Sequence, residues 1–406
     1  MSAGSRNPTI DGLRGFSALL VLLYHLYNMS VGAGFCRPIA NHYVATSLPK
    51  LAMFAVMLFF CISGYLIVQS LVKHADVPTF LKDRVIRIYP LFLALHLVMF
   101  TAGPLAGYGW MGSLKHSIAG YVASFTSNLL FLPGMLDLPL AQKNAWSLSY
   151  EAAFYLIASL FYLSWSLRRV RKLTAAALAT VALSGSAAAI WFHPDSAFFL
   201  VGVVAFGMAT IGLRWMDGPW QAANGIVFLL LSLTFFRTFA PLSMLFGLAL
   251  FLTVIHEVGW FSAFLRTRVL QYLGKISYSL YLIHPFVLDL LRSVVRRFAT
   301  TDGPHWMLAF VAVGIPLSIV VAAFSFRYLE TGGGRFLRRV WGSEPAGRSS
   351  GRIASPSRRS ISPRSPAGSL EPATCSSATF ASLPKRWPSR SHHFDRFPSG
   401  RRGASL

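Results

Sequence analysis

Apolar runs recur from the amino terminus to about residue 330, and they constrain the fold more than any other feature of the sequence. Of the 406 residues, 54% are hydrophobic and only 13% are charged, a composition typical of chains that cross a bilayer repeatedly. A membrane helix needs about 20 consecutive apolar residues, and most of these runs approach that length. The sequence therefore predicts an all-α polytopic membrane protein.

The charges between the runs predict how the chain is threaded, because Lys and Arg concentrate in cytoplasmic loops. The apolar segment 121–133 is short, and counting it as a span would place the basic cluster 168–172 outside. We therefore predict a re-entrant segment there, a cytoplasmic loop over 73–87, and about ten spans with both termini in the cytoplasm. The predicted spans are 9–30, 51–72, 88–106, 146–165, 173–192, 197–213, 221–240, 241–258, one that opens at Gly274, and 306–329.

Composition divides the chain at about residue 340. Residues 1–340 carry the apolar runs and are predicted to form the membrane domain. Residues 341–406 hold eleven Lys or Arg against three Asp or Glu, and are rich in Ser and Pro. This basic tail has little apolar surface to bury and is predicted to be disordered. Such a tail can contact anionic lipid or nucleic acid, but we expect a passenger segment and no nucleic-acid partner.

The three cysteines, Cys36, Cys61 and Cys375, lie far apart in the sequence. Disulfide frameworks and zinc sites both show paired or regular cysteine spacing. We therefore predict neither a disulfide nor a metal site.

One face of the first run carries two ionisable residues, Arg14 and His25. They are eleven residues apart, which is close to three helical turns or about 16 Å along the axis. Ionisable side chains inside a bilayer are costly and usually mark a pathway or a reactive centre. A plain alternative is that Arg14 reaches the membrane interface and His25 is a satisfied core residue.

Two further features suggest chemistry. Arg84 and Arg87 are three apart, so on a helical start they share a face, and paired guanidinium forks suit phosphate groups. Topological charge alone would also account for them. Glu151 lies about five residues from the outer end of its predicted helix, as His25 does in its own. A carboxylate and an imidazole at similar depth predict a buried pair.

The second predicted span contains Ser63, Gly64 and Tyr65. Small residues in membrane helices allow neighbours to approach closely, so we expect this group and Trp146 to serve packing or to line a pore.

The ninth predicted span carries a polar stripe at positions i, i+3 and i+6, made of Tyr278, Tyr281 and His284. These residues are secondary candidates for the site. For His284 we favour a packing role over that of a second proton carrier. Pro285 follows it and should kink the helix.

Five patterns occur in order along residues 7–340. They are Asp11-Gly-Leu-Arg14-Gly with His25, Phe59-Phe-x-x-Ser63-Gly64-Tyr65, Arg84-x-x-Arg87, Trp146-Ser-Leu-x-x-Glu151-x-x-Phe154-Tyr155, and Ser277-Tyr278-x-x-Tyr281-x-x-His284-x-Phe. Together they resemble the bacterial integral-membrane acyltransferases of acyltransferase family 3, which O-acetylate lipopolysaccharide, peptidoglycan, capsule and related glycans. The resemblance implies a ten-helix domain in the inner membrane that takes acetyl groups from cytoplasmic acetyl-CoA to an acceptor on the far side.

The resemblance also implies roles for single residues. His25 matches the residue usually taken as catalytic, Arg14 its essential partner, and Arg84 and Arg87 a cytoplasmic arginine pair. Acetyl-CoA would be a co-substrate, with no permanently bound cofactor, and the partner would be a glycan or lipid-linked sugar. Two departures stand out. Glu330 is not followed two residues later by Pro, and the tail is too short to fold as an extracytoplasmic esterase-like domain, so acceptors that rely on one are less expected.

These residues suggest a mechanism. The phosphates of CoA would dock at Arg84 and Arg87, the pantetheine arm would pass Arg14, and His25, oriented by Glu151, would deprotonate the acceptor hydroxyl. Two other classes compete with this interpretation. A proton-coupled transporter would use the His–Glu pair as a relay, and a structural subunit would leave these ionisable residues without a purpose. The sequence leaves the acceptor and the acyl chain open.

Overall fold

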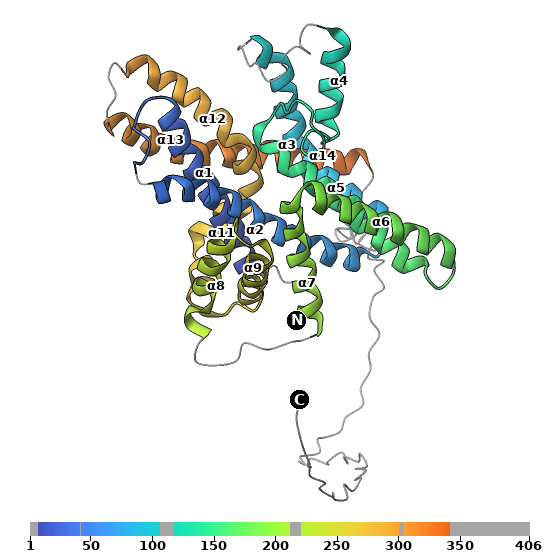
Figure 1. Ribbon diagram of the computed structural model, residues 1–406. Coiled ribbons are helices and arrows are strands. Elements are labelled where there is room, and N and C mark those ends of the chain that lie inside the picture. Colours follow the sequence, from blue (N-terminus) through green and yellow to red (C-terminus); the bar gives the residue numbers. More distant parts are fainter. Residues whose placement is uncertain (1–6, 41, 106–116, 212–220, 300–303, 342–406) are drawn as a thin grey trace, which may run out of the picture. The chain divides into compact units, whose positions relative to one another are not determined.

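The computed structural model describes residues 7–40, 42–105, 117–211, 221–299 and 304–341, and every regular element in these ranges is a helix (Figure 1). All of them belong to the first of two compact units, Met1–Pro345. The all-α prediction is therefore confirmed for the described part of the chain. The predicted disorder of the basic tail lies outside the described residues.

The described helices follow one another in this order along the chain. They are α1 (Pro8–Gly32), α2 (His42–His74), α3 (Val77–Leu105), α4 (Ile118–Leu129), η2 (Lys143–Ala145), α5 (Trp146–Leu167), α6 (Lys172–Phe192), η3 (Pro194–Ala197), α7 (Phe198–Ile211), α8 (Gln221–Phe235), α9 (Ala240–Ile255), α10 (Gly259–Leu265), α11 (Arg268–Lys275), α12 (Ser277–Phe298), α13 (Pro304–Ser325), η4 (Phe326–Glu330) and α14 (Thr331–Val340).

Seven helices in the described ranges are long and apolar enough to cross a membrane, and the bent pair α9–α10 would make an eighth. A multi-pass membrane protein follows from these spans. The segment predicted to be re-entrant, 121–133, overlaps α4, which at 12 residues is shorter than a span. The count of ten spans and the re-entrant path both stay predictions.

The prediction that residues 73–87 form a loop is wrong, because α3 begins at Val77 and most of the basic stretch is helical. Its cytoplasmic location stays a prediction. Asp76 precedes the helix, and its side chain accepts a hydrogen bond of 2.9 Å from the backbone N–H of Thr79. Pro78 follows in the first turn, where proline is well tolerated. An Asp cap and an early Pro are a helix start that the apolar pattern alone does not reveal. Arg84 and Arg87 therefore project from a rigid helix.

Glycines bring α1 against α10 and α11 at backbone distance. A Cβ at Gly274 would lie 1.8 Å from the carbonyl oxygen of Asp11, and one at Gly12 would lie 1.9 Å from that of Leu265. Only a residue without a side chain fits such a contact. These contacts set the axial position of α1, which carries both Arg14 and His25.

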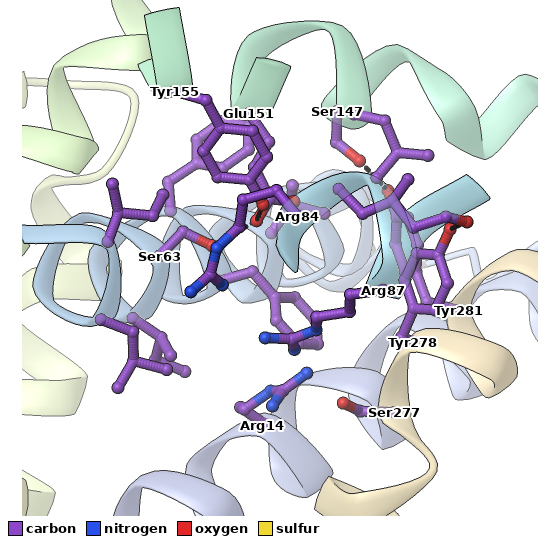
Figure 2. Close-up of a pocket in the computed structure, with 18 residues that line it drawn as sticks. Arg14, Ser63, Arg84, Arg87, Ser147, Glu151, Tyr155, Ser277, Tyr278 and Tyr281 are labelled. Carbon is purple, nitrogen blue, oxygen red and sulfur yellow. Dashed lines mark hydrogen bonds between the residues drawn. The ribbon is translucent and has the colours of Figure 1, made fainter. Parts of the chain in front are cut away.

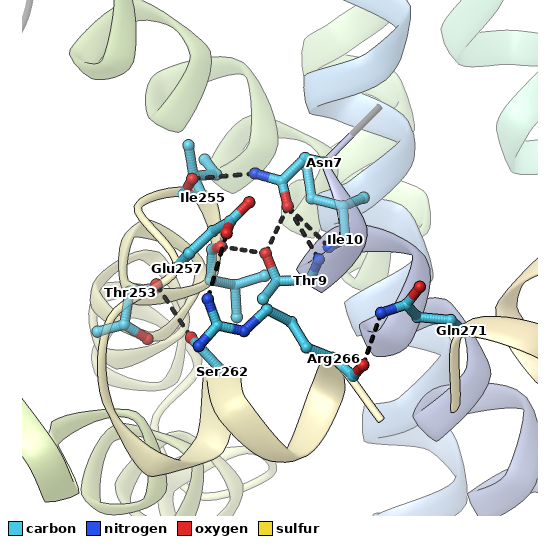
Figure 3. Close-up of polar contacts among 10 residues, drawn as sticks. Asn7, Thr9, Ile10, Thr253, Ile255, Glu257, Ser262, Arg266 and Gln271 are labelled. Atoms are coloured by element: carbon cyan, nitrogen blue, oxygen red, sulfur yellow. Dashed lines mark hydrogen bonds and ion pairs between the residues drawn. The ribbon is translucent and has the colours of Figure 1, made fainter. Parts of the chain in front are cut away.

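Polar contacts fix the start of α1 beside the break between α9 and α10 (Figure 3). The Asn7 side chain accepts hydrogen bonds from the backbone N–H groups of Thr9 and Ile10, and donates one of 3.0 Å to the carbonyl of Ile255. The Thr9 hydroxyl donates to the carbonyl of Val254 at 2.7 Å. One end of α1 is thus capped while the final carbonyls of α9 are satisfied.

Replacing Gly274 with alanine should strongly destabilise the protein, because the new methyl group meets backbone rather than a movable side chain. Overpacking typically lowers the free energy of unfolding by about 1–3 kcal/mol, and we expect a loss at or above the upper end of that range. Thermal unfolding in detergent measures it. Gly207→Ala on α7 is the matched control, because nothing lies within 4 Å of its Cβ position, and an equal loss in both variants would contradict the packing argument.

Candidate functional site

Two cavities lie one after the other along the same helices. The first, which we call the arginine cavity, is lined by Arg14, Arg84, Arg87, Glu151, Tyr278 and Tyr281 among others. The second, the histidine pocket, has a volume of about 530 Å³ and is lined by His25, Lys143, Asn144, Asp289 and Arg292 together with a mostly apolar wall.

Three helical stretches, α1, α12 and the continuous η2–α5, contribute residues to both cavities. Helix α1 contributes Arg14 to the first and His25 to the second, while α12 contributes Tyr281 to the first and Phe286 to the second. In α5 and the preceding η2 the order is reversed, with Glu151 in the first cavity and Lys143 in the second. The cavities are therefore stacked along the helix axes, and the eleven residues from Arg14 to His25 separate them by about 16 Å.

Three guanidinium groups converge on the arginine cavity (Figure 2). Arg84 is already held, since it donates a hydrogen bond of 2.8 Å to the Ser70 hydroxyl and lies over the ring of Phe80 at 5.1 Å. Arg14 and Arg87 make no hydrogen bond or ion pair with any described residue. Two guanidinium forks without a partner among the described residues, beside a third, have the chemistry that suits an anion such as phosphate.

The carboxylate of Glu151 also lines this cavity. It accepts a hydrogen bond of 3.1 Å from the Ser63 hydroxyl and another from the Tyr155 hydroxyl. Tyr278 forms a further part of the wall, and its hydroxyl donates a hydrogen bond of 2.7 Å to the carbonyl of Ile88. These contacts fix the shape of the cavity around the arginines.

The predicted pairing of Glu151 with His25 is wrong. Glu151 faces the arginines in one cavity, whereas His25 lies in the other, and no hydrogen bond joins the two. The prediction counted depth from helix ends, which assumed that all helices end at the same level. In the structure the helix ends do not fix the relative depth of the two residues. Glu151 is held by Ser63 and Tyr155 in the arginine cavity, whereas His25 packs on His284 beside the other pocket.

The ring of His25 packs against another imidazole instead. Its centroid lies 5.1 Å from that of His284 and 5.4 Å from that of Tyr24. Neither nitrogen of His25 makes a hydrogen bond with a described residue. A ring in that state, facing a pocket, has a nitrogen available for a ligand hydroxyl.

A buried layer of hydrogen bonds separates the cavities, and we call it the partition. The Ser147 hydroxyl lies 3.0 Å from that of Tyr281 and 3.2 Å from the carbonyl oxygen of Asn144. The Asn144 side-chain amide donates a hydrogen bond of 2.9 Å to the carbonyl of Tyr281. Sequence reasoning missed Asn144 and Ser147. Their signal was two polar residues, three apart, on either side of Trp146 in an apolar stretch.

The remaining predicted residues lie around the arginine cavity. Gly64 lies at the contact of α2 with α7, where a Cβ would meet the carbonyl oxygen of Phe199 at 2.2 Å. Tyr65 is buried against aromatic rings of α7 and α9, and Trp146 packs edge-on against Phe60. Ser63 faces the cavity. Helix α12 continues as a helix through Pro285.

Comparison with known proteins gives an independent view of the chain. A family model for an acyltransferase domain matches residues 7–323. No solved structure matches the chain.

Curated relatives carry acyltransferase names. The chain is 26% identical over 370 residues to an O-acetyltransferase candidate of Staphylococcus aureus (strain COL), covering 80% of this chain and 56% of the relative. It is 27% identical over 365 residues to acyltransferase MdmB of Streptomyces mycarofaciens, covering 76% and 88%. Peptidoglycan O-acetyltransferase OatA of Listeria monocytogenes is 23% identical over 369 residues, covering 80% and 55%. The chain spans little more than half the length of the staphylococcal and listerial relatives.

Proposed function

This chain belongs to the acyltransferase family whose domain matches residues 7–323, and we propose that it is a membrane-bound O-acyltransferase. The acyl group, most simply acetyl, would come from acyl-CoA on the cytoplasmic side. The acceptor would be a hydroxyl of an extracytoplasmic glycan or lipid-linked sugar. The bacterial inner membrane, about ten spans and cytoplasmic termini complete the proposal.

The observation that carries the proposal is the stacking of an anion-binding cavity on a pocket that contains an unpaired imidazole. Acyl transfer from CoA across a membrane needs a site for a phosphorylated donor and a base for the acceptor hydroxyl, and the thioester would have to cross the partition between them. A transporter needs only a continuous path. The separation of Glu151 from His25 also removes the relay on which the transporter alternative depended.

The donor would use the arginine cavity. Its phosphates would meet Arg84 and Arg87, and the thin pantetheine arm would pass Arg14 toward the partition. Glu151 lies beside these arginines, so its charge would act on the donor rather than on His25.

The acceptor would enter the histidine pocket, whose volume of about 530 Å³ and mostly apolar wall are typical of small-molecule sites. A nitrogen of His25 takes the proton of the acceptor hydroxyl as its oxygen attacks the thioester carbonyl. The carbon–sulfur bond then breaks, the ester remains on the acceptor, and the CoA thiolate recovers the proton. A neutral imidazole near pH 7 suits both proton transfers.

Sided proteoliposomes test the proposed function. Labelled acetyl-CoA is supplied on one face and envelope glycan or lipid-linked sugar on the other, and label in the acceptor is measured. We expect transfer only when acetyl-CoA is on the face of the membrane that carries the connection between α2 and α3. Transfer that requires both substrates on the same face would overturn the transmembrane route, and transport of label without ester formation would favour the transporter.

Glu151→Gln should leave the shape of the arginine cavity intact and tighten acetyl-CoA binding by roughly two- to fivefold, because it removes one negative charge beside the phosphate site. Since Glu151 and His25 lie in different cavities, the change in Kd should be the same in the wild-type and His25→Ala backgrounds. Isothermal titration measures all four constants. A change that disappears in the His25→Ala background would restore the coupling that the geometry excludes.

A further inference from the structure

The partition contacts His284, the ring that packs on His25, through the Asn144 side chain. Asn144 is 6% exposed and lies between Tyr281 and His284, and the ring of His284 packs on that of His25. We propose that Asn144 is a positioning residue, which holds His284 as a neutral imidazole in one tautomer beside His25. This inference rests on the proposed function of His25.

The hydrogen bonds of His284 assign its proton. Nδ1 lies 2.8 Å from the carbonyl oxygen of Leu280, and a carbonyl can only accept, so Nδ1 carries the hydrogen. In a neutral imidazole Nε2 is then an acceptor. The Asn144 amide nitrogen lies 3.5 Å from Nε2 and can donate to it. Because His284 is 1% exposed, water does not replace this donor.

The Asn144 amide is suited to this task because it has two N–H groups. One is directed to the carbonyl of Tyr281 at 2.9 Å and the other to His284. A donor that is itself tied to the backbone of α12 holds the ring at a fixed angle. The same amide therefore both closes the partition and sets the state of His284.

Neutrality of His284 matters for the reaction. When His25 takes the acceptor proton it becomes a cation, with the centroid of His284 only 5.1 Å away. A second cation there would oppose the charge that His25 acquires. The other charges facing this region are Lys143 on η2 and the ion pair between Asp289 and Arg292 on α12, joined at 2.8 Å. On α1 the facing titratable groups are His25 itself and Tyr24, and α5 contributes Glu151 behind the partition.

Asn144→Asp tests the donor role because a protonated carboxyl keeps one donor, whereas an ionised one has none and favours a charged His284. The activity of the variant relative to wild type, taken at each pH, should therefore rise by about tenfold from pH 8.5 to pH 5.5, as expected for recovery of one buried hydrogen bond. Turnover at saturating acetyl-CoA is measured, and acetyl-CoA binding confirms that each variant is folded. A relative activity that does not change with pH would overturn the proposal.

Ser147→Ala is the matched control. Ser147 contacts Asn144 and Tyr281 in the partition but does not touch His284. Its relative turnover should therefore be the same at every pH, and a rise equal to that of Asn144→Asp would assign the effect to the partition and overturn the role of His284.

A double-mutant cycle gives a second, independent test. Asn144→Ala should lower turnover in the wild type but cost little more in a His284→Ala background, because it acts through that ring. Full additivity would show that Asn144 works elsewhere.

Discussion

Replacing His25 with alanine should lower acyl transfer by about 10²–10⁴-fold, the usual contribution of a general base. The variant should fold and bind acetyl-CoA as the wild type does, because His25 contributes no hydrogen bond to the described part of the chain and lies outside the arginine cavity. Turnover with labelled acetyl-CoA and a competent acceptor measures the loss.

The control for that experiment is another histidine. His305 is exposed near the start of α13, and its ring contact within the described ranges is with Trp306. His305→Ala should therefore retain full activity. Activity of His25→Ala within tenfold of the wild type would overturn the role of His25 as the base. A His25→Ala protein that also fails to bind acetyl-CoA would place the residue in the donor site.

Replacing Arg87 with alanine should raise the KM for acetyl-CoA by about 10- to 100-fold, with a smaller effect on turnover. The reason is that Arg87 lines the arginine cavity without a partner among the described residues, so its donors are available to a phosphate. Removing one charge-assisted hydrogen-bonded contact costs about 1.5–3 kcal/mol. Steady-state kinetics at varied acetyl-CoA measure the change.

Neighbouring variants sharpen this result. Arg87→Lys keeps the charge but loses the two-pronged geometry, so its KM should fall between those of the wild type and Arg87→Ala. Arg168→Ala is the control. The Arg168 guanidinium lies 3.2 Å from the centroid of the Trp165 ring, and Arg168 lines neither cavity. Collapse of turnover with an unchanged KM in Arg87→Ala would show that Arg87 is not part of a CoA site.

Much of the site could be predicted because membrane spans contain few ionisable residues, so the few that occur are conspicuous. Arg14, His25, Arg84 and Arg87 stood out as ionisable groups within or next to apolar runs, where each carries a cost that needs a reason. The structure brings the three arginines together in one cavity. The chemistry of single residues was thus readable from their type and their setting.

The relative depth of residues on different helices could not be predicted. Depth depends on how far each helix slides along its neighbour, and in this protein the backbone contacts at Gly12 and Gly274 set that position for α1. A sequence shows the glycines but not their partners. This is why Glu151 was assigned to His25, and why Asn144, which contacts residues more than a hundred positions away, was missed.

The central claim is that donor binding and proton transfer belong to separate cavities, and acetyl-CoA binding to purified variants tests it most directly. Isothermal titration should give the same Kd for His25→Ala as for the wild type, and a Kd about 10- to 100-fold weaker for Arg87→Ala. Weak binding by His25→Ala together with wild-type binding by Arg87→Ala would contradict the account.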